Sequence, residues 1–237
     1  SPEEVTGGYF DSNMEWHELG GESAPTIEAI FDRTEPSGKY EFTHEGAIVT
    51  YGLHGFSNIT GAIVHGATTI TQSSQGTQVE PFAFMPSLKI LVLPDLASIY
   101  SGSKFQYSFT DDGILVLPKL NGGQYQAFGS ACKVKTLDLG EVTPRIPALN
   151  QCNNLSVLIL RNKDNVVSMN STNDMNNTHF KSGGSGGEIY VPSALIDSYK
   201  VASNWSTYEG YGTITWKALE GSVYEDPEWW KDIWEEL

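Results

Sequence analysis

The chain of 237 residues is long enough to bury a substantial hydrophobic core in one or two domains. Acidic residues outnumber basic ones by 29 to 14, which gives a formal net charge of -15. This charge argues against nucleic acid or an anionic membrane surface as a partner, because both select clustered lysine and arginine. No apolar run reaches the roughly 18 residues that a membrane span needs, so we expect no membrane insertion.

The first part of the chain indicates short strands. Residues 1–25 lack a regular pattern and are expected to be peripheral. Tyr40–Phe42 alternates in polarity, and Ala47–Val49 and Ala62–Val64 are short apolar runs separated by glycine. We expect residues 1–59 to form an amino-terminal segment and a small β cap, because an uncovered first repeat would expose its apolar side.

A short apolar pattern recurs through the middle of the chain. Leu88, Leu91 and Leu93 are spaced three and then two residues apart. The spacing returns in full or in part at Ile59/Ala62/Val64, Asp112/Leu115/Leu117, Val134/Leu137/Leu139, Leu155/Leu158/Leu160 and Ile189/Val191. From Leu93 onward, the last apolar position recurs after 24, 22, 21 and 31 residues. Steps of about 20–29 residues are typical of leucine-rich repeats.

The spacing has a physical reason. Alternate residues of a strand face opposite sides, so Leu91 and Leu93 face one way while Ile90 and Val92 face the other. One such strand cannot bury its leucines, whereas parallel stacking lets each repeat cover the next. The intervening stretches are rich in turn formers and lack a long helical period, so they predict short irregular returns. We therefore expect residues 60–220 to form a stacked solenoid with a parallel sheet.

Three stretches carry a family resemblance: Leu93–Ile99, Gln126–Cys132 with its Ala-Phe pair, and Ile189–Pro192 followed by Tyr199 and Trp205. Residues 60–220 resemble the BspA-like leucine-rich repeats of bacterial surface proteins, although the Ala-Phe pair is absent before Cys152. The resemblance implies a mixed β/α fold. It would be a right-handed leucine-rich-repeat solenoid with a parallel sheet, short irregular returns, a small β-rich amino-terminal cap and a carboxyl-terminal cap. It also implies an extracellular adhesion or recognition module on a bacterial cell surface.

Cys132 and Cys152 occupy nearly the same position in neighbouring repeats. Two buried thiols that act as small hydrophobic side chains are the favoured interpretation. A disulfide between stacked repeats is the alternative, because adjacent strands lie close enough to permit one.

The long step contains an insertion, residues 162–187, whose centre is rich in Asn and Ser and which ends in a glycine-serine run. This composition predicts a surface loop with a flexible return. Such a loop is either a recognition loop or a tolerated insertion.

The outward positions of the predicted sheet are mostly apolar or aromatic. The candidate binding residues among them are Ile90, Val92, Ile114, Val116, Asp138, Val157, Ile159 and Tyr190. A monomer seldom leaves such a patch in water, so we expect the amino-terminal segment, an identical subunit or a partner protein to cover it. A strand register shifted by one residue would instead exchange the two faces.

After the last repeat, Pro192-Ser193 is a plausible helix start, and Trp205 and Tyr208 are expected to close the apolar end. Thr213–Trp216 predicts a last strand.

Residues 221–237 predict an acidic tail helix that starts at Asp226-Pro227. One face of this helix carries the second set of candidate binding residues, Trp229, Trp230, Ile233, Trp234 and Leu237. The helix is expected to dock either on its own solenoid or in a groove of another protein.

No set of residues indicates catalysis or metal binding. The histidines are scattered, and the single Gly-x-Ser-x-Gly match, Gly183–Gly187, lacks the preceding apolar strand of a nucleophile elbow. We therefore expect a non-enzymatic module without a cofactor that binds a protein or a glycan, with self-association as a further option. The alternatives are a structural subunit of an assembly and, least favoured, a carbohydrate-active enzyme.

Overall fold

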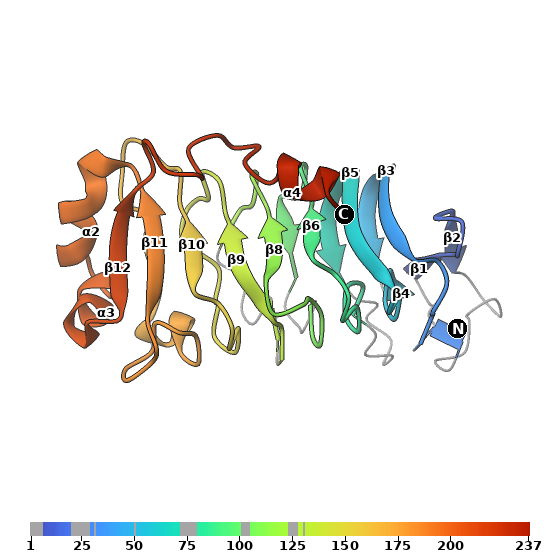
Figure 1. Ribbon diagram of the computed structural model, residues 1–237, viewed down its shortest axis with the longest axis horizontal. Helices are drawn as coiled ribbons and strands as arrows, with labels where there is room; N and C mark the ends of the chain where they lie inside the picture. Colours follow the sequence, from blue (N-terminus) through green and yellow to red (C-terminus); the bar gives the residue numbers. More distant parts are fainter. Residues whose placement is uncertain are drawn as a thin grey trace, which may run out of the picture.

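The computed structural model describes residues 7–19, 29–30, 32–49, 51–71, 80–100, 105–122, 128–129 and 131–237. Its centre is one large parallel sheet whose strands lie side by side in chain order, as Figure 1 shows. The amino-terminal part lies at one end of this sheet, and two short helices lie at the other. Residues 126, 127 and 130 of the resemblance stretch Gln126–Cys132 lie outside the described residues.

The large sheet has nine strands within the described part of the chain. Along its main path these are β3 (Gly38–Val49), β5 (Ile59–Thr71), β6 (Ile90–Val92), β8 (Gly113–Val116), β9 (Val134–Asp138), β10 (Val157–Ile159), β11 (Gly187–Val191) and β12 (Ile214–Ala218). A ninth strand, β7 (Ser98–Ile99), pairs with the second half of β5. All these pairings are parallel, so the expected parallel sheet in a mixed α/β fold is confirmed.

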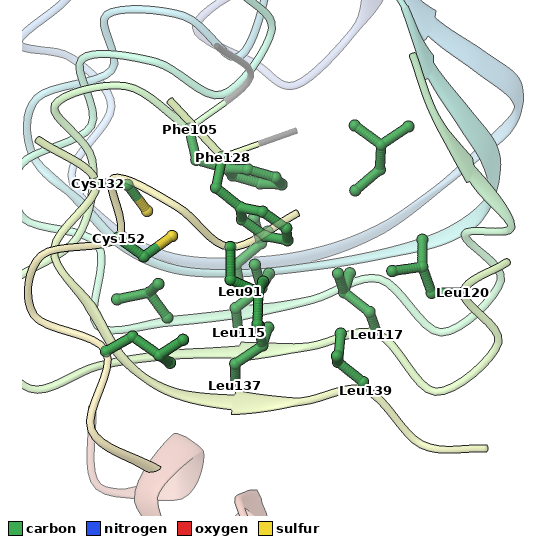
Figure 2. Packing of buried hydrophobic residues seen from close by; sticks show 14 of the residues in the cluster. Leu91, Phe105, Leu115, Leu117, Leu120, Phe128, Cys132, Leu137, Leu139 and Cys152 are labelled. Atoms are coloured by element: carbon green, nitrogen blue, oxygen red, sulfur yellow. The ribbon is translucent and has the colours of Figure 1, made fainter. Parts of the chain in front are cut away.

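The register places the recurring leucines in one row. Paired positions along the sheet are Ala62, Leu91, Leu115, Leu137, Leu158 and Ile189, and all of them belong to the main core. The backbone N–H groups of Leu93, Leu117 and Leu139 continue the ladder, donating to the next strand at 3.1, 2.8 and 3.1 Å. Figure 2 shows Leu91, Leu115 and Leu137 stacked above one another. The predicted inward face is thus confirmed, and a register shifted by one residue is excluded.

The amino-terminal residues form a second, small sheet. β1 (Gly7–Phe10) pairs antiparallel with β2 (Trp16–Leu19) and parallel with β4 (Tyr51–Gly52). Phe10 joins the main core, so the small sheet packs against the first strands of the large one. β3 belongs to the large sheet, so that sheet begins within the predicted amino-terminal segment. Residues 1–6 and 20–28 of that segment lie outside the described residues.

The opposite end of the core is closed by η3 (Ser193–Leu195), α2 (Ile196–Val201) and α3 (Trp205–Tyr211). Trp205 and Tyr208 are fully buried there, as the sequence predicts, and Tyr199 is fully buried beside them. The indole N–H of Trp205 donates to the carbonyl of Val167 at 2.8 Å. Burial raises the pKa of Tyr199 to about 12, since the charged phenolate is disfavoured away from water.

The insertion is more ordered than its composition predicts. It contains a short 3-10 helix, η2 (Thr172–Met175), that starts with a capping box at Ser171. Its apolar side chains Val167, Met169, Met175 and Phe180 belong to the main core. The prediction of a surface loop is therefore wrong for residues 167–180, because these four side chains extend the core between β10 and β11. The flexible return expected of the glycine-serine run stays a prediction.

Cys132 and Cys152 are both buried and unbonded. Figure 2 shows their sulfur atoms turned toward each other beside the phenylalanines of the core. A hydrogen bond with the Cys132 thiol, together with burial, raises the pKa of Cys152 well above its usual value. The interpretation as two buried thiols is confirmed.

Candidate binding groove

The outward face of the large sheet is crossed by the end of the chain. Residues 219–237, here called the C-terminal segment, run back from the last strand β12 toward β5 (Figure 1). Trp230 and Trp234 form one buried cluster with five outward side chains of β5, β6 and β8, which are Ile63, Ile90, Val92, Ile114 and Val116. The structure thus brings together the two sets of candidate residues that the sequence singles out.

A second cluster covers the sheet nearer to β12. Val157, Ile159 and Leu219 are buried, and Tyr190, Tyr224 and Trp229 pack around them. The Tyr224 ring meets the rings of Tyr190 and Trp229 edge to face, with centroids 4.7 Å apart in both pairs. These contacts hold Tyr224 and Trp229 in fixed orientations.

Between the two clusters lies a buried ion pair. Arg161 donates to Asp138 from Nη2 at 2.8 Å and from Nε at 3.2 Å. Asp138 Oδ2, which accepts from Arg161 Nη2, also accepts the indole N–H of Trp229 at 2.9 Å, and Asp138 Oδ1 accepts the backbone N–H of Gly140 at 3.0 Å. Arg161 reaches the carbonyl of Glu225 at 3.2 Å. Asp138 is one of the candidate binding residues at outward positions of the sheet. Its carboxylate instead binds other residues of the same chain and so anchors the C-terminal segment.

The last turn of the chain is α4 (Lys231–Glu235), which is shorter than the predicted tail helix. The chain first makes a turn at Asp226, whose carboxylate accepts the N–H of Glu228 at 2.9 Å. This turn directs Trp229 toward Asp138, while Trp230 and Trp234 lie over the sheet in the other cluster. The ammonium of Lys39 in β3 donates to the carbonyl of Trp234 at 2.7 Å and so ties the end of the C-terminal segment to β3.

The C-terminal segment leaves a groove of about 700 Å³ over the middle of the sheet. Its floor contains outward positions of β8 to β11, which are Ile114, Thr136, Val157 and Glu188. One side is formed by Tyr224, Trp229 and Ile233 of the C-terminal segment. The remaining lining comes from strand starts and the end of the insertion: Lys89, Asp112, Lys135, Ser156, His179, Ser185, Gly186 and Gly187.

Few of the predicted site residues line this groove. Ile114, Val157, Trp229 and Ile233 do. Most of the others pack in the two clusters, namely Ile90, Val92, Val116, Ile159, Tyr190, Trp230 and Trp234. Asp138 instead pairs with Arg161, and Leu237 is exposed near Gly61. Sequence reasoning missed the polar residues Lys89, Lys135 and Ser156, each of which directly precedes the first outward residue of its strand. Aligning the repeats at that position would have found them.

The charged groups of the groove are partly paired. Lys89 binds the Asp112 carboxylate, and this hydrogen bond lowers the pKa of Asp112. Glu188 accepts the hydroxyl of Tyr190 at 3.1 Å and lies 3.9 Å from the Lys217 ammonium. Burial and the nearby Glu188 raise the pKa of Tyr190 to about 12. Lys135 is exposed and forms no ion pair with the acidic side chains that the structure describes.

His179 and Ser185 stand at one end of the groove. The His179 Nδ1 and the Ser185 hydroxyl lie 3.0 Å apart, and the His179 carbonyl accepts the N–H of Gly186 at 2.9 Å. These bonds close the glycine-serine loop that contains the Gly-x-Ser-x-Gly match. Among the described residues no carboxylate hydrogen-bonds to His179, and no group of three His, Cys, Asp or Glu side chains could hold a metal ion.

A second cavity, of about 690 Å³, lies beside Arg161 under the other edge of the C-terminal segment. Its lining includes Pro118, Pro192, Leu219 and Pro227. It lacks the aromatic side chains of the groove, so the groove is the better candidate for a ligand site.

Within the described ranges, no helix combines the length and apolar character that crossing a membrane requires. Comparisons with models of protein families, with curated proteins and with solved structures give no match to this chain.

Proposed function

We propose that the protein is a leucine-rich-repeat solenoid of the BspA-like type that serves as a non-enzymatic recognition module on a bacterial surface. The in-register leucine row and the parallel pairing of successive repeats support the solenoid. A rigid stacked sheet also suits recognition, since it holds side chains from several repeats on one face.

The single observation that carries the recognition function is the groove of about 700 Å³ on the sheet face. The C-terminal segment buries the apolar outward positions and leaves a mixed polar and aromatic surface beside them. Ligand sites of about 300–1,000 Å³ with a few convergent polar groups are common in proteins. The groove therefore offers a preformed site. The apolar outward side chains that Trp230 and Trp234 cover hold the C-terminal segment in place beside it.

The alternative role as a structural subunit loses its main argument. It depended on an apolar sheet face that needs another protein to cover it, and the chain's own C-terminal segment occupies that face.

Binding to cultured epithelial cells tests the recognition function. Labelled wild-type protein should bind saturably in flow cytometry, and Ser156→Tyr should weaken binding about tenfold because the larger ring fills part of the groove. Ser37→Tyr is the matched control, since Ser37 is exposed and precedes β3 at a distance from the groove. Absence of saturable binding, or equal loss in both variants, would contradict the proposal.

A further inference from the structure

We propose that the groove binds a neutral oligosaccharide. The inference rests on the proposed function, because it assigns a ligand class to the same site. It follows from the charge balance of the groove, from its fixed aromatic side chains and from the strands that form its floor.

The charges of the groove cancel. Two lysines, Lys89 and Lys135, face two carboxylates, Asp112 and Glu188, among its lining residues. One of these lysines is already bound to a carboxylate of the groove. A polyanion or a polycation would meet repulsion along with attraction, so the groove favours a ligand without net charge.

Two aromatic side chains form one wall of the groove at a fixed angle. Trp229 is held by the hydrogen bond that its indole N–H donates to the Asp138 carboxylate and by its edge-to-face contact with Tyr224. Both side chains remain half-buried, so part of each ring faces the groove. Rings that are already fixed lose little conformational entropy when a ligand binds.

The remaining lining is rich in short polar groups. Thr136, Ser156 and Ser185 contribute hydroxyls, and the lysines and carboxylates supply donors and acceptors. A sugar ring presents C–H groups on its faces and hydroxyls around its rim. The negative face of an aromatic ring attracts the C–H groups, and the polar side chains can bond the hydroxyls.

A peptide fits this site less well. The floor strands β8 to β11 are each paired on both sides, so none offers a free edge to which an extended peptide could add. An amphipathic helix would need an apolar groove, and the most apolar part of the face is already covered by Trp230 and Trp234.

An array of neutral, sialylated and sulfated oligosaccharides tests the ligand class directly. We expect wild-type binding only to neutral members, and titration calorimetry with the best of them should give a measurable Kd. Tyr224→Ala should weaken that Kd about tenfold, because the aromatic wall is lost. Tyr224→Phe keeps the ring and should retain most of the affinity.

Two controls separate loss of the site from loss of the fold. Tyr211→Ala removes an exposed aromatic residue of α3, outside the groove, and should leave the Kd unchanged. Ser156→Tyr obstructs the groove from the sheet side and should also weaken binding. Thermal melting of each variant shows whether the fold is intact.

The outcomes distinguish the ligand class from the function. Cell binding that Ser156→Tyr weakens shows that the groove is used. If that binding survives periodate treatment of the cells but is lost after protease treatment, the recognition function stands and the oligosaccharide is overturned. Binding confined to sialylated or sulfated members would overturn it as well. If the wild-type protein shows no binding that the groove variants weaken, either on cells or on the array, both proposals are overturned.

Discussion

At the scale of single residues, the pair Asp138 and Arg161 joins the sheet to the C-terminal segment. Asp138 lies at an outward position of β9, and Arg161 stands two residues after Ile159, the last outward residue of β10; both are nine-tenths buried or more. Burying two charges is costly, and the cost is offset only where the geometry is good and the remaining hydrogen bonds are made. Here Trp229, Gly140 and Glu225 supply those bonds.

We expect Arg161→Met to destabilise the protein by about 3–5 kcal/mol, because it leaves the Asp138 carboxylate buried without its partner. The double variant Asp138→Leu/Arg161→Met should recover much of this loss, since neither charge remains. Urea denaturation followed by tryptophan fluorescence measures both. The control is Asp112→Asn, which breaks an ion pair with a largely exposed carboxylate and should cost less than about 1 kcal/mol. A double variant as unstable as the single one would contradict this account.

At the scale of elements, α4 packs on β5 only because β5 carries glycine at the contact. A Cβ at Gly61 would lie 2.6 Å from the Trp234 ring and 2.9 Å from Leu237. The sequence gives no sign of this requirement, because Gly61 and Trp234 are separated by most of the chain.

Gly61→Ala should therefore destabilise the protein by about 1–3 kcal/mol, through displacement of the tryptophan ring. Gly210→Ala is the matched control, since a Cβ at Gly210 meets nothing within 4 Å and alanine favours the helix α3. Thermal denaturation should show a lower midpoint for the first variant and an equal or higher one for the second. An unchanged midpoint for Gly61→Ala would show that α4 is not held against β5.

At the scale of the whole molecule, the C-terminal segment connects the last strand of the large sheet with the first ones. Its tryptophans contact β5, β6 and β8, and its tyrosine contacts β11. In a proposed solenoid each repeat otherwise contacts only its neighbours, so this segment adds long-range contacts.

Removal of residues 220–237 should expose the apolar outward face and make the remaining chain self-associate. Size-exclusion chromatography with light scattering should show a monomer for the full chain at micromolar concentration and larger species for the truncated one. Binding of an apolar dye should rise in parallel. A truncated chain that stays monomeric would show that the sheet face needs no cover.

Much of the architecture was predictable because the repeat is local. Leu91, Leu115 and Leu137 lie in one interior row since alternation in a strand and burial of leucine both follow from neighbouring residues. The buried end at Trp205 and Tyr208 was predictable for the same reason. The burial of the insertion's apolar side chains was not predictable, because Met169, Met175 and Phe180 stand among residues that usually form loops.

The sequence by itself determined the parallel sheet and its buried row of leucines. An apolar position that recurs at a regular step is buried when strands that carry it lie side by side in parallel, and this pattern is contained in residues close to one another. Only the tertiary structure decided what covers the outward face, and hence where the groove lies. The contacts of Trp229 with Asp138 and of Trp234 with Gly61 join parts of the chain that no local pattern connects. The apolar face of the C-terminal segment and the outward face of the sheet could equally have bound a second protein. Only the path of the chain brings these two faces together within one molecule.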